Sequence, residues 1–119
     1  MCKKYRIGID AGGTKVAYGL FDADGQLLDR MQHPSDINAD GPAFSDRMIE
    51  TIREIEKKHN LKNEDLQGIG ICMPSYILFD TGYVYLTSAL TNIRDFPMKE
   101  YLQERLPGVK IILDNDSNA

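Results

Sequence analysis

The sequence predicts an α/β domain in which one sheet combines antiparallel and parallel strands, in the element order β-β-β-α-β-α-β. Residues 5–34 contain three β-like runs separated by turn signals. Two helical segments then alternate with two short apolar runs, at residues 68–74 and 109–114. Because helical crossovers join parallel strands, we expect the later strands to pair in parallel.

The first three strands are expected to form an antiparallel meander. They are placed at residues 5–11, 15–23 and 26–34, where β-branched, aromatic and other apolar residues are frequent. Gly-Gly-Thr at residues 12–14 and Asp-Ala-Asp-Gly at residues 22–25 supply the turns. Strands that are joined by such short turns pair antiparallel.

Two helices are expected, at residues 42–60 and 97–106, and each begins with a proline, which suits a first turn. The first helix carries apolar residues at helical spacing, with charged residues on its other face. These apolar residues are Phe44, Met48, Ile52 and Ile55.

The region between the helices starts with residues 68–74 (GIGICMP), which predict a strand buried on both faces. Residues 75–96 are expected to be irregular, with one hairpin about Asp80-Thr81-Gly82. Residues 109–114 (VKIILD) predict the final strand.

Composition restricts the class of protein. The chain has 119 residues, enough for one domain with a single core. Its net charge of −4 argues against a nucleic-acid binder. No apolar run approaches the roughly 20 residues that span a membrane. Cys2 and Cys72 lack metal-ligand spacing, and Cys72 is expected to be a buried thiol in a reducing compartment, so a cytoplasmic protein is predicted.

A first candidate site follows the first strand. It comprises Asp10, Gly12, Gly13, Thr14 and Lys15. Glycines let backbone N–H groups approach an anion, the threonine adds a hydroxyl, and the lysine can neutralise phosphate charge. Asp10 can hold a magnesium ion, which favours one or two carboxylates plus phosphate oxygens. On these residues alone, a Gly-Gly turn with a capping Asp explains the stretch equally well.

A second candidate site follows the last strand, at Asp114-Asn115-Asp116. A carboxylate at a strand end can accept a proton from a substrate hydroxyl, and an asparagine can both donate to and accept from a polyol. The alternative is that Asp116 or Ser117 caps a following helix.

The two candidate sites lie at corresponding ends of strands. If the first, fourth and last strands are neighbours, their carboxyl ends share one edge of the sheet. We therefore expect Asp10 and Asp116 to converge on one cleft.

Three segments, in this order, resemble the amino-terminal domain of the ROK family of sugar kinases and repressors: IGIDAGGTKVAYGLFDADGQLL, GIGICMPSYILFDTGYVY and IILDNDSNA. The resemblance extends from Arg6 to Ala119 and favours a phosphate loop over a simple turn. It implies a ribonuclease-H-like fold of the actin-like ATPase superfamily. It also implies ATP-dependent phosphorylation of a hexose or related sugar.

The resemblance assigns roles to the candidate residues. It implies that Asp10, Gly12, Gly13 and Thr14 lie at the ATP phosphates and magnesium. Asp116 matches the family's catalytic base, which activates a sugar hydroxyl for attack on the γ-phosphate. Asn115 matches a sugar-binding position.

The identity of the sugar stays open because two motifs depart from the family pattern. The family usually has Pro-Gly in the loop near the sugar, where this chain has Pro74 and Ser75. A sugar-binding Asn of the family aligns with Ala89 without gaps, or with Asn92 after a small shift. The sugar is therefore glucose, an N-acetylated amino sugar, a mannose- or fructose-type sugar, or a glycoside.

The chain ends where the second polar cluster begins, so residues 1–119 are expected to be one ATPase-type domain of a longer protein. In the family a second domain supplies further sugar contacts, the adenine pocket and commonly a zinc site, so zinc is expected only there. The fragment alone is expected to be inactive and to expose a surface that the second domain covers. The resemblance allows a homodimer of the full-length protein.

Two other functions are compatible with the same resemblance. One is a sugar-sensing ROK-type transcriptional repressor, and the other is a sugar-binding module without turnover. Repressors of the family carry a helix-turn-helix domain before the Asp-x-Gly-Gly-Thr strand. Only residues 1–5 precede that strand here, and the chain is acidic, so the kinase is favoured.

Overall fold

The computed structural model describes residues 5–36, 38–73, 75–78, 83–87 and 93–115. The strands are β1 (Tyr5–Ala11), β2 (Lys15–Phe21), β3 (Leu27–Pro34), β4 (Leu66–Met73), β5 (Ser75–Leu78), β6 (Tyr83–Thr87), β7 (Arg94–Phe96) and β8 (Lys110–Asn115). The helices are α1 (Gly41–Lys58), the single 3-10 turn η1 (Asn63–Asp65) and α2 (Met98–Arg105).

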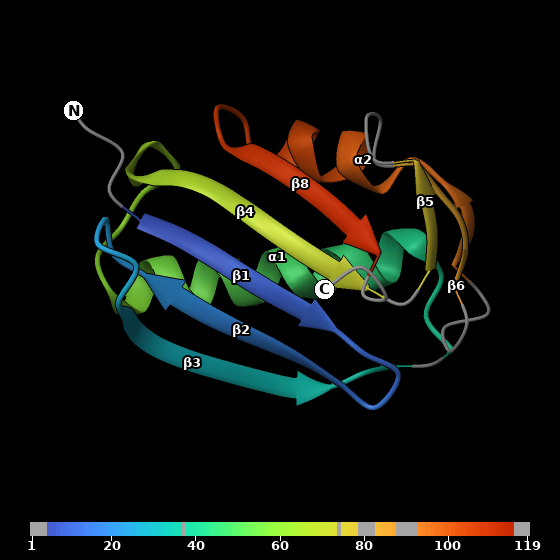
Figure 1. Ribbon diagram of the computed structural model, residues 1–119, viewed down its shortest axis with the longest axis horizontal. Coiled ribbons are helices and arrows are strands. Elements are labelled where there is room, and N and C mark those ends of the chain that lie inside the picture. The colour runs from blue at the N-terminus through green and yellow to red at the C-terminus, as the bar shows by residue number, and fades with distance from the viewer. Residues whose placement is uncertain (1–4, 37, 74, 79–82, 88–92, 116–119) are drawn as a thin grey trace.

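The main sheet has five strands in the order β3-β2-β1-β4-β8 (Figure 1). β1, β2 and β3 pair antiparallel, whereas β1 pairs in parallel with β4, and β4 with β8. This confirms the predicted mixed sheet and the adjacency of the first, fourth and last strands of the prediction. The carboxyl ends of β1, β3, β4 and β8 therefore meet at one edge.

The helices cover one face of this sheet (Figure 1). The side chains of α1 that were predicted to face the core, Phe44, Met48, Ile52 and Ile55, are all buried. Asp40 begins the helix, because its Oδ1 accepts the Ala43 N–H at 2.9 Å. The helix ends at Lys58, two residues before the predicted end, where Asn60 adopts a left-handed φ of 56°.

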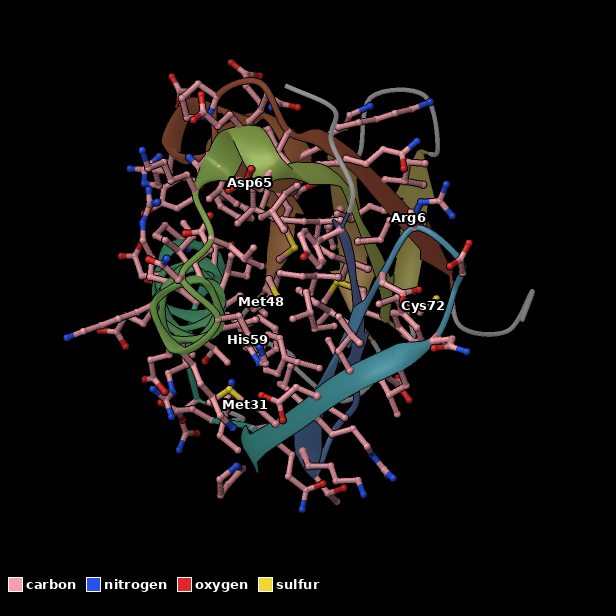
Figure 2. The ribbon with its side chains drawn as sticks, turned by 90° about the vertical axis from the view of Figure 1, so that its left-hand side faces the viewer. Arg6, Met31, Met48, His59, Asp65 and Cys72 are labelled. Carbon is pink, nitrogen blue, oxygen red and sulfur yellow. The ribbon has the colours of Figure 1, made fainter. Side chains whose placement is uncertain are left out.

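The opposite face of the sheet is open, which corrects the prediction that β4 is buried on both faces. Ile69, Ile71 and Met73 are buried beneath the helices, whereas Gly68, Gly70 and Cys72 point the other way. Figure 2 shows Cys72 on the side of the sheet away from α1. Cys72 is half-buried, not buried as predicted.

We call this surface the open face. An open groove of about 660 Å³ runs along it, and its lining includes Gly8, Asp10, Gly19, Gly70, Cys72 and Ile112. Gly8 pairs with Gly19 on one side and Gly70 on the other, and the Phe21 ring and Leu27 lie against Gly19, whereas no atom lies within 4 Å of a Cβ built on Gly70. The surface beside Gly70 therefore stays open.

Within residues 75–96, which were predicted to be irregular, the described strands β5, β6 and β7 form a second sheet. It has three strands, in the order β5-β6-β7. The antiparallel pairing of β5 with β6 confirms the predicted hairpin, although residues 79–82 of its turn lie outside the described residues. β7 was not predicted, and its Phe96 ring lies against the start of α1 at Gly41.

Of the residues described, those in the helices form no segment that is both long and apolar enough to cross a membrane.

Substitution by alanine should destabilise the domain at Gly41 and have little effect at Gly70. A Cβ at position 41 would overlap the Phe96 ring, whereas a Cβ at position 70 meets no atom within 4 Å. We expect Gly41→Ala to lower the free energy of unfolding by about 1–3 kcal/mol, as overpacking does. Gly70→Ala, the matched control, should change it by less than about 0.5 kcal/mol. Urea titration of both variants measures this, and equal effects would contradict the described packing.

Candidate phosphate and sugar site

The loop between β1 and β2 contains two backbone donors that bond to no residue that the structure describes. The Gly12 N–H donates to the Lys15 carbonyl at 2.9 Å, which closes the hairpin. The carbonyls of Gly12 and Thr14 accept from the Ser35 hydroxyl and the Ser35 N–H, at 2.6 and 3.0 Å. The N–H groups of Gly13 and Thr14 make no hydrogen bond within the part of the chain that the structure describes. Adjacent unpaired N–H groups of this kind favour an anion.

Backbone conformation bears on whether Gly12 and Gly13 serve a phosphate site or a simple turn. The described glycines with a positive φ are Gly25 and Gly108, at 82° and 81°, so Gly12 and Gly13 do not serve a left-handed turn. A Cβ on Gly12 would lie 3.3 Å from the Lys15 carbonyl oxygen, so the close hairpin explains this glycine. The Gly13 N–H makes no hydrogen bond to a described residue and lies in a surface loop, so it is available to a ligand.

Asp10 lies beside this loop with its carboxylate available. It is exposed, and its neighbours Ile9 and Ala11 are buried, so alternation places Asp10 on the open face. It forms no ion pair with any described residue.

A single carboxylate suits magnesium when phosphate oxygens and water complete the coordination. Within the described ranges, no three His, Cys, Asp or Glu side chains are grouped to hold a metal by themselves. Asp10 beside these two N–H groups therefore fits a magnesium ion that arrives with a phosphate ligand.

The register of the parallel strands brings the two candidate sites to the same edge. Asp10 pairs with Cys72 across β1 and β4, and Cys72 pairs with Asp114 across β4 and β8. Two strand spacings separate the backbones of Asp10 and Asp114 by about 10 Å. Asp116, the predicted base, follows Asn115 directly but lies outside the described residues.

The predicted sugar residues are described only in part. Pro74, Asn92 and the alternative Ala89 lie outside the described residues, and Ser75 and Asn115 are described by their backbone. Met73, the residue before Pro74, pairs with Asn115. The end of β4 and the end of β8 therefore lie side by side, which brings the chain entering Ser75 close to the chain entering Asp116.

Sequence reasoning missed Ser35, which contacts the loop between β1 and β2 from the end of β3. The signal that identifies it is the strand register. Lys15 pairs with Pro34 across β2 and β3, so the next position along β3 faces Thr14. Ser35 thus extends the β2–β3 ladder by one hydrogen bond.

Two further residues behind Ser35 were not among the predicted candidates. The Tyr18 hydroxyl lies 2.8 Å from His33 Nε2, and His33 Nδ1 lies 3.0 Å from the Pro34 carbonyl oxygen. A carbonyl oxygen only accepts, so Nδ1 carries the hydrogen, and in the neutral ring Nε2 accepts from Tyr18. Burial raises the pKa of Tyr18 to about 12, so its hydroxyl keeps its proton at neutral pH.

The ROK family matches residues 6–119 of the chain. A glucokinase from Halalkalibacterium halodurans is 31% identical over 122 residues, covering 99% of this chain and 35% of that relative. The chain therefore spans about a third of the length of this relative.

Two solved structures illustrate the fold. A ROK family glucokinase from Streptomyces griseus, in complex with glucose and AMPPNP, has a TM-score of 0.74 and 25% identity, covering 96% of this chain and 34% of that one. A ROK family transcriptional regulator, a homologue of the E. coli MLC protein, has a TM-score of 0.79 and 16% identity, covering 94% of this chain and 28% of that one. The neighbours confirm the predicted actin-like ATPase fold.

An anion titration followed by NMR tests whether the loop between β1 and β2 binds phosphate. Inorganic triphosphate with magnesium should shift the amide resonances of Gly13 and Thr14, because their N–H groups are unpaired. The Gly25 amide is the internal control, because it donates to the Asp22 carbonyl in the turn at the other edge of the sheet. Equal shifts at Gly13 and Gly25 would mean that the loop is not the anion site.

Proposed function

The chain belongs to the ROK family, and we propose that it is the phosphate- and sugar-binding part of an ATP-dependent kinase of a hexose or related sugar. One observation carries this proposal: the unpaired N–H groups of Gly13 and Thr14 and the carboxylate of Asp10 lie at the edge where β8 ends. The glucokinase relative and the structure with glucose and AMPPNP support the substrate class.

On the nucleotide side, the loop provides position and positive charge. The N–H groups of Gly13 and Thr14 donate to phosphate oxygens, and Lys15, which is exposed, balances their charge. Asp10 holds magnesium directly or through water, and this ion, when bound, supplies neutralisation of the phosphate charge. Phosphoryl transfer depends mainly on positioning and charge neutralisation, so this set is sufficient for the phosphate half of the site.

On the sugar side, Asp116 acts as the general base. It takes the proton from a sugar hydroxyl, whose oxygen attacks the γ-phosphorus as the bond to the β–γ bridging oxygen breaks, which gives sugar phosphate and ADP. In this proposal Asn115, Pro74, Ser75 and Asn92 contribute the contacts to the sugar. Glucose is the first sugar to test, followed by amino sugars, mannose, fructose and glycosides.

The rest of the site comes from a longer chain in this proposal. Because the matched relatives are about three times as long, we infer that further residues close the cleft, bind the adenine and cover the open face. Zinc, if used, binds there, and the kinase works in the cytoplasm. The regulator, at 16% identity, shares the fold alone, so it gives the repressor alternative no added support.

Asp116→Asn in the full-length protein separates transfer from binding. Loss of the base should lower kcat by about 10²–10⁴-fold, because an amide cannot take the proton. The dissociation constant for the sugar should change by less than about threefold, since the amide still accepts a hydrogen bond. Coupled assay of ADP release and calorimetric sugar titration measure the two quantities.

Asp24→Asn is the matched control, because Asp24 is exposed in the turn at the other edge of the sheet. Unchanged kcat in Asp116→Asn would overturn the role of the base. A wild-type protein that binds sugar and transfers no phosphate would overturn the kinase and favour the binding module or the repressor.

A further inference from the structure

We propose that Ser35 is the positioning residue of the phosphate loop, which it holds in the conformation that presents the Gly13 N–H to phosphate. This inference rests on the proposed function. Ser35 lies outside the Asp10–Lys15 stretch and is separated from Gly12 by 23 positions in the chain.

Ser35 contacts the loop through both of its donors. Its hydroxyl donates to the Gly12 carbonyl at 2.6 Å, and its N–H donates to the Thr14 carbonyl at 3.0 Å. These two carbonyls flank Gly13, so one residue fixes the loop on both sides of the glycine that carries an unpaired N–H. Ser35 is half-buried, which limits competition from water for these bonds.

The hydrogen bond from Ser35 to the Gly12 carbonyl also sets the direction of the Gly13 N–H, because both groups belong to one planar peptide. All described peptide bonds are trans, so a carbonyl and the N–H of the same peptide point in opposite directions. With the Gly12 carbonyl directed at Ser35, the Gly13 N–H points away from Ser35. The hydroxyl of Ser35 therefore determines which side of the loop presents this donor.

Gly12 and Gly13 need such a constraint because glycine has no strong conformational preference of its own. Without the hydroxyl, the peptide between them can rotate, and the loop presents the Gly13 N–H in only a fraction of molecules. The apparent affinity for phosphate then falls by that fraction.

Ser35 is itself held by the core of the domain. Pro34 ends β3 opposite Lys15, and its carbonyl accepts from His33 Nδ1. The Tyr18 hydroxyl orients the His33 ring from the other nitrogen, and Tyr18 is only 3% exposed. These contacts orient the peptide that precedes Ser35 from the buried face of the sheet.

The test uses the full-length protein and three variants. Ser35→Ala removes the hydroxyl, and Ser35→Thr keeps one. Gln103→Ala is the matched control: Gln103 Nε2 also donates to two backbone carbonyls, of Leu106 and Val109 at 3.1 and 2.7 Å, but at the opposite edge of the sheet. Calorimetry gives the dissociation constants for AMPPNP with magnesium and for glucose, and thermal unfolding gives Tm.

We expect Ser35→Ala to weaken AMPPNP binding by about tenfold, the effect of losing one hydrogen bond that holds a binding group. Glucose binding should stay within about threefold, and Ser35→Thr should recover most of the AMPPNP affinity. Gln103→Ala should lower Tm without changing AMPPNP binding, which distinguishes positioning from loss of stability.

Each outcome decides the inference. If the wild type binds AMPPNP and Ser35→Ala binds it equally well, or if Gln103→Ala weakens AMPPNP binding as much, Ser35 has no positioning role and the proposed kinase stands. If the wild type binds no AMPPNP, the proposed function fails and the inference fails with it.

Discussion

The parallel register of β1, β4 and β8 is the constraint on which the candidate site depends. It aligns Asp10, Cys72 and Asp114 in one row across three strands. A slip of one residue would turn Asp10 toward the helices and bring buried residues such as Ile9 to the open face. Burial of the isoleucines beneath α1 therefore fixes the position of a carboxylate on the other side of the sheet.

The same alternation explains why the two faces differ. β4 places isoleucines under the helices and glycines on the open face, so a run that looks uniformly apolar in the sequence is buried on one side only. Apolar residues that stay exposed, including Leu27 and Ile112, lie along the groove of this face. In the proposed kinase this surface is covered by the remainder of a longer chain.

The sequence was sufficient to predict the elements whose signals are local. Turn residues and alternation placed the three-stranded meander, and helical spacing placed α1 to within two residues at its end. The loop at residues 12–14 could be proposed as a phosphate site because its glycines and Asp10 are close together in the chain. β7 was not predicted, because its three residues are too few to show an alternating pattern. It is stabilised by pairing with β6.

Ser35 illustrates the limit of local reasoning most clearly. Nothing in its neighbours in the chain marks it, because its role arises from strand pairing that brings it opposite Thr14. His33 and Tyr18 likewise meet only across the β2–β3 hairpin. Site residues of this kind can be inferred once a register is known, and a list of motifs does not contain them.

The central claim is that the loop of Gly13 and Thr14 and the end of β8 bind the two reactants of one phosphoryl transfer. A crystal structure of the full-length protein with glucose and AMPPNP tests it most directly. The account predicts phosphate oxygens within hydrogen-bond distance of the Gly13 and Thr14 N–H groups, and a glucose hydroxyl against the Asp116 carboxylate. Phosphates bound away from this loop, or glucose bound away from the carboxyl ends of β4 and β8, would contradict it.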